Sequence, residues 1–333
     1  MHPAMILTNG RIHTMNPAQP AATAIAISDG RVLAVGNDDE IKSLADGRTR
    51  AIDLQGRSVT PGLVDAHVHF QHFALSLQNI DLDGAPTREE AIGRVASFAA
   101  GHRGTGWLRG RGWAQDAWPD RTFPAAADLD AIVPDRPVLL SHKSGHAAWA
   151  NSLALRMARI DEHTPDPPGG QIQRDSAGRP TGIFFEDAID LVASHVPRPT
   201  PTEVADAMQR AQAYCWSVGL TGLHDFDGRD CFLALQLLRE RGELGLRVVK
   251  NIPVYRLEHA LGVGLRSGFG DDWLRIGGVK IFADGALGSR TAAMIAPYEG
   301  EPENFGIVVT DKEEMLEKAR EAADGGLSLT VHA

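Results

Sequence analysis

The sequence has little of what marks a disulfide-rich secreted protein, a nucleic-acid-binding protein or a membrane protein. Its 333 residues include only two cysteines, which cannot build a disulfide framework, so we expect a reducing, cytoplasmic location. Aromatic residues make up 6%, and 43 acidic residues outnumber 33 basic ones. Both features disfavour nucleic-acid binding. No apolar run reaches the length of a membrane span, so no membrane partner is expected either.

Glycine and proline are abundant, at 35 and 19 residues, and they punctuate the first 60 residues into short strands. Asn9-Gly10 and Asp29-Gly30 lie between apolar runs, which is the usual signal of a tight β-hairpin. We therefore interpret residues 1–60 as the N-terminal part of a composite β-sandwich. The expected strands cover residues 5–8, 24–27 and 32–35.

Residues 61–333 read as one parallel α/β domain with a long insertion at 71–199, because apolar strands alternate with amphipathic helices after residue 200. Capping boxes predict helix starts at Thr200, with Glu203, and at Thr310, with Glu313. The cysteines, Cys215 and Cys231, fall in apolar helical patterns and are predicted as small core residues. The expected strands cover residues 220–225, 247–249, 276–282 and 327–332.

The segment Asp-Ala-His-Val-His at 65–69 follows an apolar run and carries the strongest chemical signal. Side chains i and i+2 of a strand share one face, so His67 and His69 point the same way, about 6–7 Å apart along the strand. Two neutral imidazoles on one face can bind one divalent metal ion, most often zinc. The alternative is two strand histidines that face solvent or make hydrogen bonds. Nearby His72 lies off this strand face.

Lys280 lies in an apolar segment with the pattern of a strand buried on both faces. A lysine there is costly unless it is paired or chemically changed. A buried, partly deprotonated amine can take up CO2, and the resulting carbamate can bridge two metal ions about 3.5–4 Å apart. The alternative is an ion-paired or snorkelling lysine. Lys250 has a similar setting and is the competing candidate.

Histidines also end two of the later predicted strands. His332 ends the strand at 327–332, and the C-terminal end of a barrel strand is where catalytic groups gather. Its alternative is a terminal, partly exposed histidine. His224 and Asp225 end the strand at 220–225 and either support a site or are purely structural.

Four motifs occur in the order found in the amidohydrolase superfamily. They are Asp-Ala-His-Val-His at 65–69, Thr-Gly-Leu-His-Asp at 221–225, Val-Lys-Ile-Phe-Ala-Asp-Gly-Ala-Leu-Gly-Ser-Arg-Thr at 279–291 and Leu-Thr-Val-His-Ala at 329–333. The chain most resembles the branch of metal-dependent hydrolases that includes N-substituted formamide deformylases. Val-Thr-Pro-Gly-Leu-Val-Asp at 59–65 resembles the lead into the first barrel strand of that family. Gly145-His146 with Asn151-Ser152 resembles its insertion.

The resemblance implies a TIM (β/α)8-type barrel joined to a small β-sandwich. Five of the eight barrel strands are accounted for before Ala333, so we expect a C-terminally truncated chain. The family also has a histidine on strand six, an aspartate on strand eight and further sandwich strands, none of which can be placed in this sequence.

The resemblance also implies a site. Its metal ligands are His67 and His69 from strand one, Lys280 as a carbamate from strand four, and His332 from strand five, holding one or two divalent ions, with zinc expected. Lys280 and His332 are therefore predicted as catalytic groups as well.

Substrate contacts are predicted for three further residues, Asp284 and Arg290 on the loop after strand four and His146 in the insertion. A solvated side chain is the alternative for Arg290 and His146. Around His146 the chain reads Lys-Ser-Gly-His, where relatives tend to have an aspartate before the glycine.

The predicted function is hydrolysis of a non-peptide C–N bond, in a small-molecule amide or formamide, by a metal-activated water. The family's strand-eight aspartate would carry the proton to the leaving amine. A deaminase or cyclic amidase of the same superfamily stays open, although deaminases generally lack the strand-four lysine. An inactive fragment of a longer enzyme stays open too, as does assembly into a homodimer.

Overall fold

The computed structural model describes residues 2–102, 104–285, 287 and 290–333. They form two compact units, one of residues up to Ala66 with Cys215–His224, the other of His67–Tyr214 with Asp225–Ala333. Ala286, Gly288 and Ser289 of the predicted motif at 279–291 lie outside the described residues. Within the described part, no helix is long and apolar enough to cross a bilayer. The cytoplasmic location and the homodimer stay predictions.

The first unit contains two small sheets with strand orders β5-β4-β1-β6 and β3-β2-β7. The hairpin at Asp29-Gly30 is confirmed, because β4 and β5 pair across it and both turn residues have positive φ, 51° and 71°. The hairpin at Asn9-Gly10 is wrong, because β1 pairs with β4 and β6 whereas β2 pairs with β3 and β7. The composite sandwich stays a prediction. The elements are β1 (Met5–Thr8), β2 (Arg11–His13), β3 (Ala21–Ala22), β4 (Ala24–Ser28), β5 (Arg31–Gly36), α1 (Asp38–Ser43), β6 (Arg50–Asp53) and β7 (Ser58–Val59).

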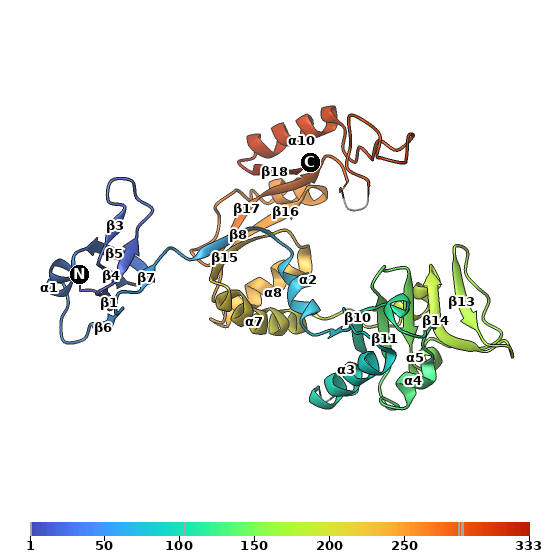
Figure 1. Ribbon diagram of the computed structural model, residues 1–333. Coiled ribbons are helices and arrows are strands. Elements are labelled where there is room, and N and C mark those ends of the chain that lie inside the picture. The colour runs from blue at the N-terminus through green and yellow to red at the C-terminus, as the bar shows by residue number, and fades with distance from the viewer. Residues whose placement is uncertain (1, 103, 286, 288–289) are drawn as a thin grey trace. The chain divides into compact units, whose positions relative to one another are not determined.

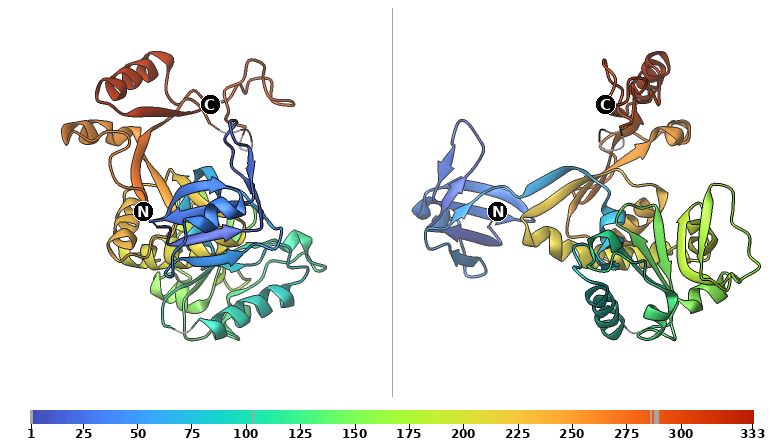
Figure 2. Two further views of the ribbon diagram at one scale, coloured as in Figure 1. Left: turned by 90° about the vertical axis from the view of Figure 1, so that its left-hand side faces the viewer. Right: turned by 45° about the vertical axis from the view of Figure 1, so that its right-hand side comes forward.

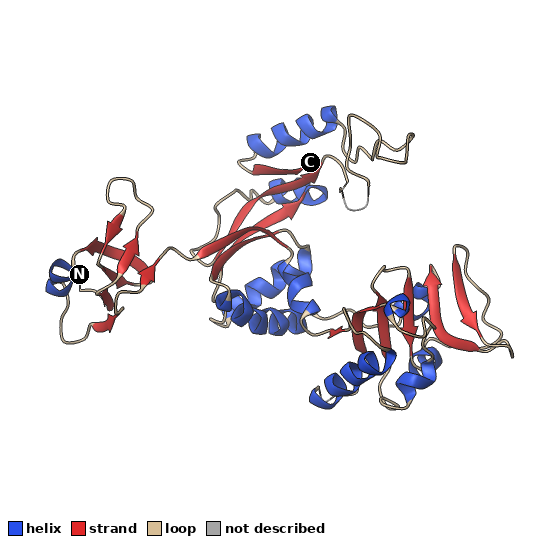
Figure 3. Cartoon of the chain, viewed as in Figure 1, coloured by secondary structure: helices blue, strands red, loops and turns tan. Residues whose placement is uncertain are grey.

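The segment between β8 (Leu63–Val68) and β15 (Leu220–Asp225) forms a sheet of its own, in the order β13-β14-β12-β11-β10-β9, with helices along it (Figure 3). Trp113, Trp118 and Trp149 are buried in its core. Buried Asn151 caps α5 and donates to two backbone carbonyls of the preceding loop. The elements are α2 (Phe70–Ser76), β9 (Ile80–Asp81), α3 (Arg88–Gly101), β10 (Leu108–Trp113), η1 (Gln115–Ala117), α4 (Ala126–Asp130), β11 (Val138–His142), β12 (Ala147–Ala150), α5 (Ser152–Met157), β13 (Gly170–Arg174), β14 (Pro180–Glu186) and α6 (Ile189–Ala193).

Five strands form a half-barrel parallel sheet in the order β18-β17-β16-β15-β8 (Figure 1). Helix α10 packs beside β18 (Figure 2). The α/β class is confirmed, whereas the complete eight-stranded barrel and the domain boundaries at residues 60, 71 and 199 stay predictions. The remaining elements are α7 (Pro201–Ser217), α8 (Arg229–Glu240), β16 (Arg247–Pro253), η2 (Val254–Arg256), α9 (Leu257–Gly262), β17 (Leu274–Phe282), α10 (Lys312–Asp324) and β18 (Ser328–His332).

Local capping decides where two of these helices begin. The Thr200 hydroxyl accepts from the Glu203 amide and the Glu203 carboxylate accepts from the Thr200 amide, so this capping box is confirmed. The box predicted at Thr310 is wrong, because Asp311 is the N-cap of α10 and accepts from the amide three residues on. Both cysteines are buried and free, as predicted.

A buried ion pair joins the C-terminal end of β15 to β16. Lys250 Nζ lies 2.6 Å from Asp225 Oδ1, with side-chain exposures of 3% and 0%. Lys250 also donates to the backbone carbonyls of Asp227 and Asn251. The competing candidate of the sequence analysis therefore has the ion-paired environment expected of a structural lysine.

We expect Lys250→Met to lower the free energy of unfolding by about 3–5 kcal/mol, because Asp225 would keep a buried charge without its cation. Lys143→Met is the matched control. Lys143 pairs with Asp83 at 2.8 Å on the exposed surface, where losing an ion pair changes stability little. Urea unfolding followed by tryptophan fluorescence measures both variants of the complete protein, and equal stabilities would contradict the structural role of Lys250.

Candidate metal centre

The turn from β8 into α2 carries His69 and His72 and is fixed by two buried carboxylates. His69 occupies the N-cap position but makes no side-chain capping bond. Asp225 instead accepts from the first amide of the helix at 2.9 Å, and Asp227 accepts from the second and third at 2.7 and 3.4 Å. These bonds satisfy helix N–H groups that have no partner within the helix, and the negative charges suit the positive end of its dipole.

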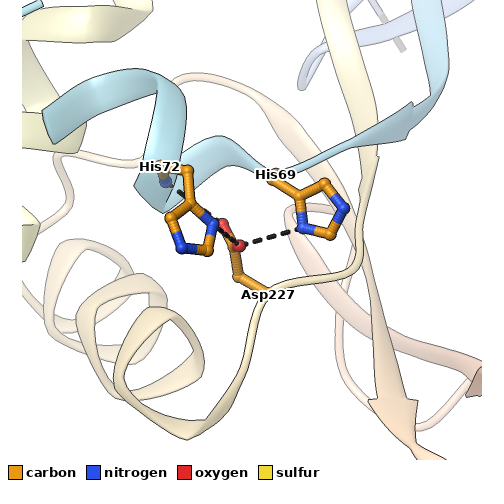
Figure 4. A group of neighbouring side chains, drawn as sticks. All are labelled: His69, His72 and Asp227. Carbon is orange, nitrogen blue, oxygen red and sulfur yellow. Dashed lines mark hydrogen bonds and ion pairs between the residues drawn. The ribbon is translucent and has the colours of Figure 1, made fainter. Parts of the chain in front are cut away.

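Asp227 also contacts the two imidazoles (Figure 4). Its Oδ1 lies 3.1 Å from His69 Nδ1 and 2.5 Å from His72 Nδ1. The Asp227 side chain is 1% exposed, whereas those of His69 and His72 are 49% and 74% exposed. An ionised carboxylate only accepts hydrogen bonds, so Nδ1 of each ring is the donor, and in the neutral ring Nε2 keeps its lone pair.

His67 lies beside His69 on the same strand end and stacks on Phe226, the residue that follows β15. The ring centroids of His67 and His69 are 5.7 Å apart, and those of His67 and Phe226 are 4.1 Å apart. The predicted pair is therefore close in space, with an aromatic ring against one of its members.

Lys280 is 5% exposed and lies between two aromatic rings. Its Nζ is 5.3 Å from the centre of Phe226 and 5.0 Å from that of Phe282. Among the described residues it has no carboxylate or hydrogen-bond partner, and burial lowers the pKa of its amine. His332 lies opposite Phe282 in the strand register, with ring centroids 5.3 Å apart. Two phenylalanine rings thus connect Lys280 to His67 on one side and to His332 on the other.

The structure does not gather the ligand atoms of all the predicted histidines into one tight cluster. In the part of the chain that it describes, His, Cys and carboxylate ligand atoms lie within 4.8 Å of one another in His69, His72 and Asp227, and in Asp225, Asp227 and Cys231. In the second group, Asp225 is already paired with Lys250, and burial raises the pKa of the Cys231 thiol well above its usual value. Both features disfavour this group as a metal site. The metal-ligand assignment stays a prediction.

The predicted substrate-contacting residues have partners of their own. Arg290 pairs with Glu301, and His146 Nδ1 lies 2.9 Å from a carboxylate oxygen of Glu186. Asp284 accepts a backbone amide with one oxygen, while its other oxygen is buried without a partner among the described residues. Of the three, Asp284 is the one with a buried polar atom that has no partner among the described residues, and all three substrate roles stay predictions.

Sequence reasoning missed Asp227 and set His72 aside. The signal was present, because Asp225 and Asp227 are spaced i, i+2 at the end of a strand, and His69 and His72 are spaced i, i+3 at a helix start. What the sequence could not show is that these two segments, about 155 residues apart, meet.

Comparisons with known proteins bear on the family. The model of the Amidohydrolase family matches residues 50–333. Protein LONG AFTER FAR-RED 3 of Arabidopsis thaliana is 32% identical over 99% of this chain and 58% of its own length. Putative amidohydrolase YtcJ of Bacillus subtilis is 32% identical over 97% of this chain and 62% of its own length. The N-substituted formamide deformylase of Arthrobacter pascens is 28% identical over 98% and 62%.

A solved structure of a metal-dependent hydrolase is also similar to this chain. An uncharacterized metal-dependent hydrolase from Pyrococcus furiosus has a TM-score of 0.79 at 30% identity, covering 99% of this chain and 67% of that one. The chain thus spans about three fifths of the length of the curated relatives named above. The match over residues 50–333, which confirms the resemblance seen in the motifs, shows that the chain belongs to the Amidohydrolase family.

Proposed function

We propose that the complete protein is a metal-dependent hydrolase of non-peptide C–N bonds, acting on a small-molecule amide or formamide. The observation that carries the proposal is Lys280, a buried amine without an ionic partner among the described residues, connected through aromatic rings to His67 and His332. Family membership supports hydrolysis, and similarity to a protein named N-substituted formamide deformylase supports the substrate class.

The chemistry of the predicted ligands suits one or two divalent cations. Three imidazoles are ligands that zinc accepts readily. His69 has its Nδ1 bonded to Asp227, so its Nε2 is available. Among the described residues, no carboxylate pairs with Lys280 to hold it as an ammonium ion, which favours the neutral amine that CO2 requires. Carbamate formation replaces one N–H bond with an N–C bond, releases a proton and gives a group whose single negative charge is shared by two oxygens, both of which suit divalent cations.

The chemistry divides between the ion and the chain. A bound zinc ion lowers the pKa of water and polarises a carbonyl. The chain's own residues hold the ligands in place: Asp227 keeps the proton on His69 Nδ1, and Phe226 packs against both His67 and Lys280. Phe282 also lies against the Lys280 amine, and the lysine is 5% exposed, so it is largely shielded from water.

The metal prediction is tested by a double substitution. The complete protein should purify with about one to two zinc-like ions per chain. His67→Ala with His69→Ala should remove them, because both strand-one ligands are lost. The control is His163→Ala with His195→Ala, two exposed histidines of the insertion segment. Elemental analysis by mass spectrometry reads out both, and unchanged metal content in the first variant would exclude the site.

The carbamate prediction is tested at Lys280. Native mass spectrometry should show an added CO2, and Lys280→Ala should lose most formamide hydrolysis. A short carboxylate such as acetate should restore part of the rate, because it would offer the pair of oxygens that the carbamate supplies. Exposed Lys42→Ala is the control and should keep wild-type rates. Full activity in Lys280→Ala, or no added mass on the metal-loaded protein, would refute the carbamate and reopen the deaminase alternative.

A further inference from the structure

We infer that Asp227 is a positioning residue of the metal centre, holding His69 with its proton on Nδ1 so that Nε2 is presented to the ion. The inference rests on the proposed function in one respect, that His69 is a metal ligand. It assigns a role to a carboxylate that the sequence motifs do not single out.

The hydrogen bonds around Asp227 carry the argument. Its two oxygens receive Nδ1 of His69, Nδ1 of His72 and two helix amides of α2. Four N–H donors account for the lone-pair sites of one ionised carboxylate. Each neutral imidazole is thereby fixed as the tautomer with an unprotonated Nε2. A carboxylate that accepts from the other ring nitrogen orients metal-binding histidines in the same way.

The position of Asp227 is itself fixed from the protein interior. Its backbone amide donates to Asp225 Oδ1 at 3.0 Å, and its carbonyl accepts from Lys250. The Asp225–Lys250 pair is buried between β15 and β16, so these two strands fix the position of the Asp227 carboxylate. His69 is half exposed, and the hydrogen bond from its Nδ1 to this buried carboxylate orients the ring.

The same three residues could instead hold a metal ion directly, since their ligand atoms lie within 4.8 Å of one another. Direct binding would require both Nδ1 atoms to lose the protons that they now donate in hydrogen bonds to Asp227. It would also place His72 on equal terms with His69. The two arrangements therefore make opposite predictions for His72. If Asp227 positions His69, His72 is not needed for metal binding; if the three residues bind the ion directly, it is.

The test compares zinc affinity in variants of the complete protein, by competition with a chromophoric chelator. Asp227→Ala should weaken zinc binding about 10–100-fold. Asp227→Asn, which keeps a carbonyl acceptor for Nδ1–H, should lie between it and the wild type. His72→Ala should bind zinc like the wild type. Asp230→Ala is the matched control, because Asp230 is an exposed carboxylate three residues on, paired with Arg229.

A second measurement reads the imidazole tautomer without any bound metal. Nitrogen-15 NMR of the imidazoles in the chelator-treated protein should show His69 protonated at Nδ1 and bare at Nε2. In Asp227→Ala the ring should shift toward the Nε2-protonated form that free imidazole side chains favour. A structural role confined to capping α2 would leave the tautomer unchanged.

The outcomes separate the two claims. Unchanged zinc affinity and tautomer in Asp227→Ala would overturn the positioning role. Equal losses in His69→Ala, His72→Ala and Asp227→Ala would also overturn it, in favour of a metal site made by the three residues themselves. Unchanged metal content in His69→Ala would refute the proposed ligand, while the NMR result would still report whether Asp227 fixes that ring.

Discussion

The buried Asp225–Lys250 pair is the interaction on which the geometry of this site depends. It sits where β15 ends, and it fixes a short acidic segment whose two carboxylates take the first three amides of α2. A helix of seven residues has little stability of its own, so its start is defined by these tertiary bonds. The candidate metal ligand His69 lies at that start. The charge pair in the interior thus controls a side chain at the surface.

Two lysines in similar apolar strands illustrate how environment separates structure from chemistry. Lys250 is surrounded by oxygen atoms and remains a paired cation. Lys280 is surrounded by ring carbons, and burial lowers its pKa. Only the second has the surroundings of an amine that can react with CO2. Sequence context alone, which is a run of apolar residues around a lysine in both cases, does not distinguish them.

Much of the fold follows from local patterns that the sequence shows directly. Alternating apolar runs predicted the parallel strands and the box at Thr200 predicted the start of α7, because the spacing of apolar residues and a helix cap are both visible within a few residues of sequence. Predictions were wrong where they assumed that a residue's partners lie close to it in sequence and the partners are in fact distant. Asn9-Gly10 has hairpin residues, yet each flanking strand pairs elsewhere. Asp227 was missed for the same reason, because its partners His69 and His72 lie on the other side of a long inserted segment.

The central claim is that the metal centre uses Nε2 of His69 together with Lys280, and the location of the metal in crystals tests it most directly. Diffraction from the complete protein grown with zinc, recorded on both sides of the zinc absorption edge, gives the metal position independently of any assumed ligand. The account predicts anomalous density shared by His67, His69 and His332, with forked density extending from Lys280. Anomalous density between the Nδ1 atoms of His69 and His72 beside Asp227, with an unmodified Lys280, would contradict it.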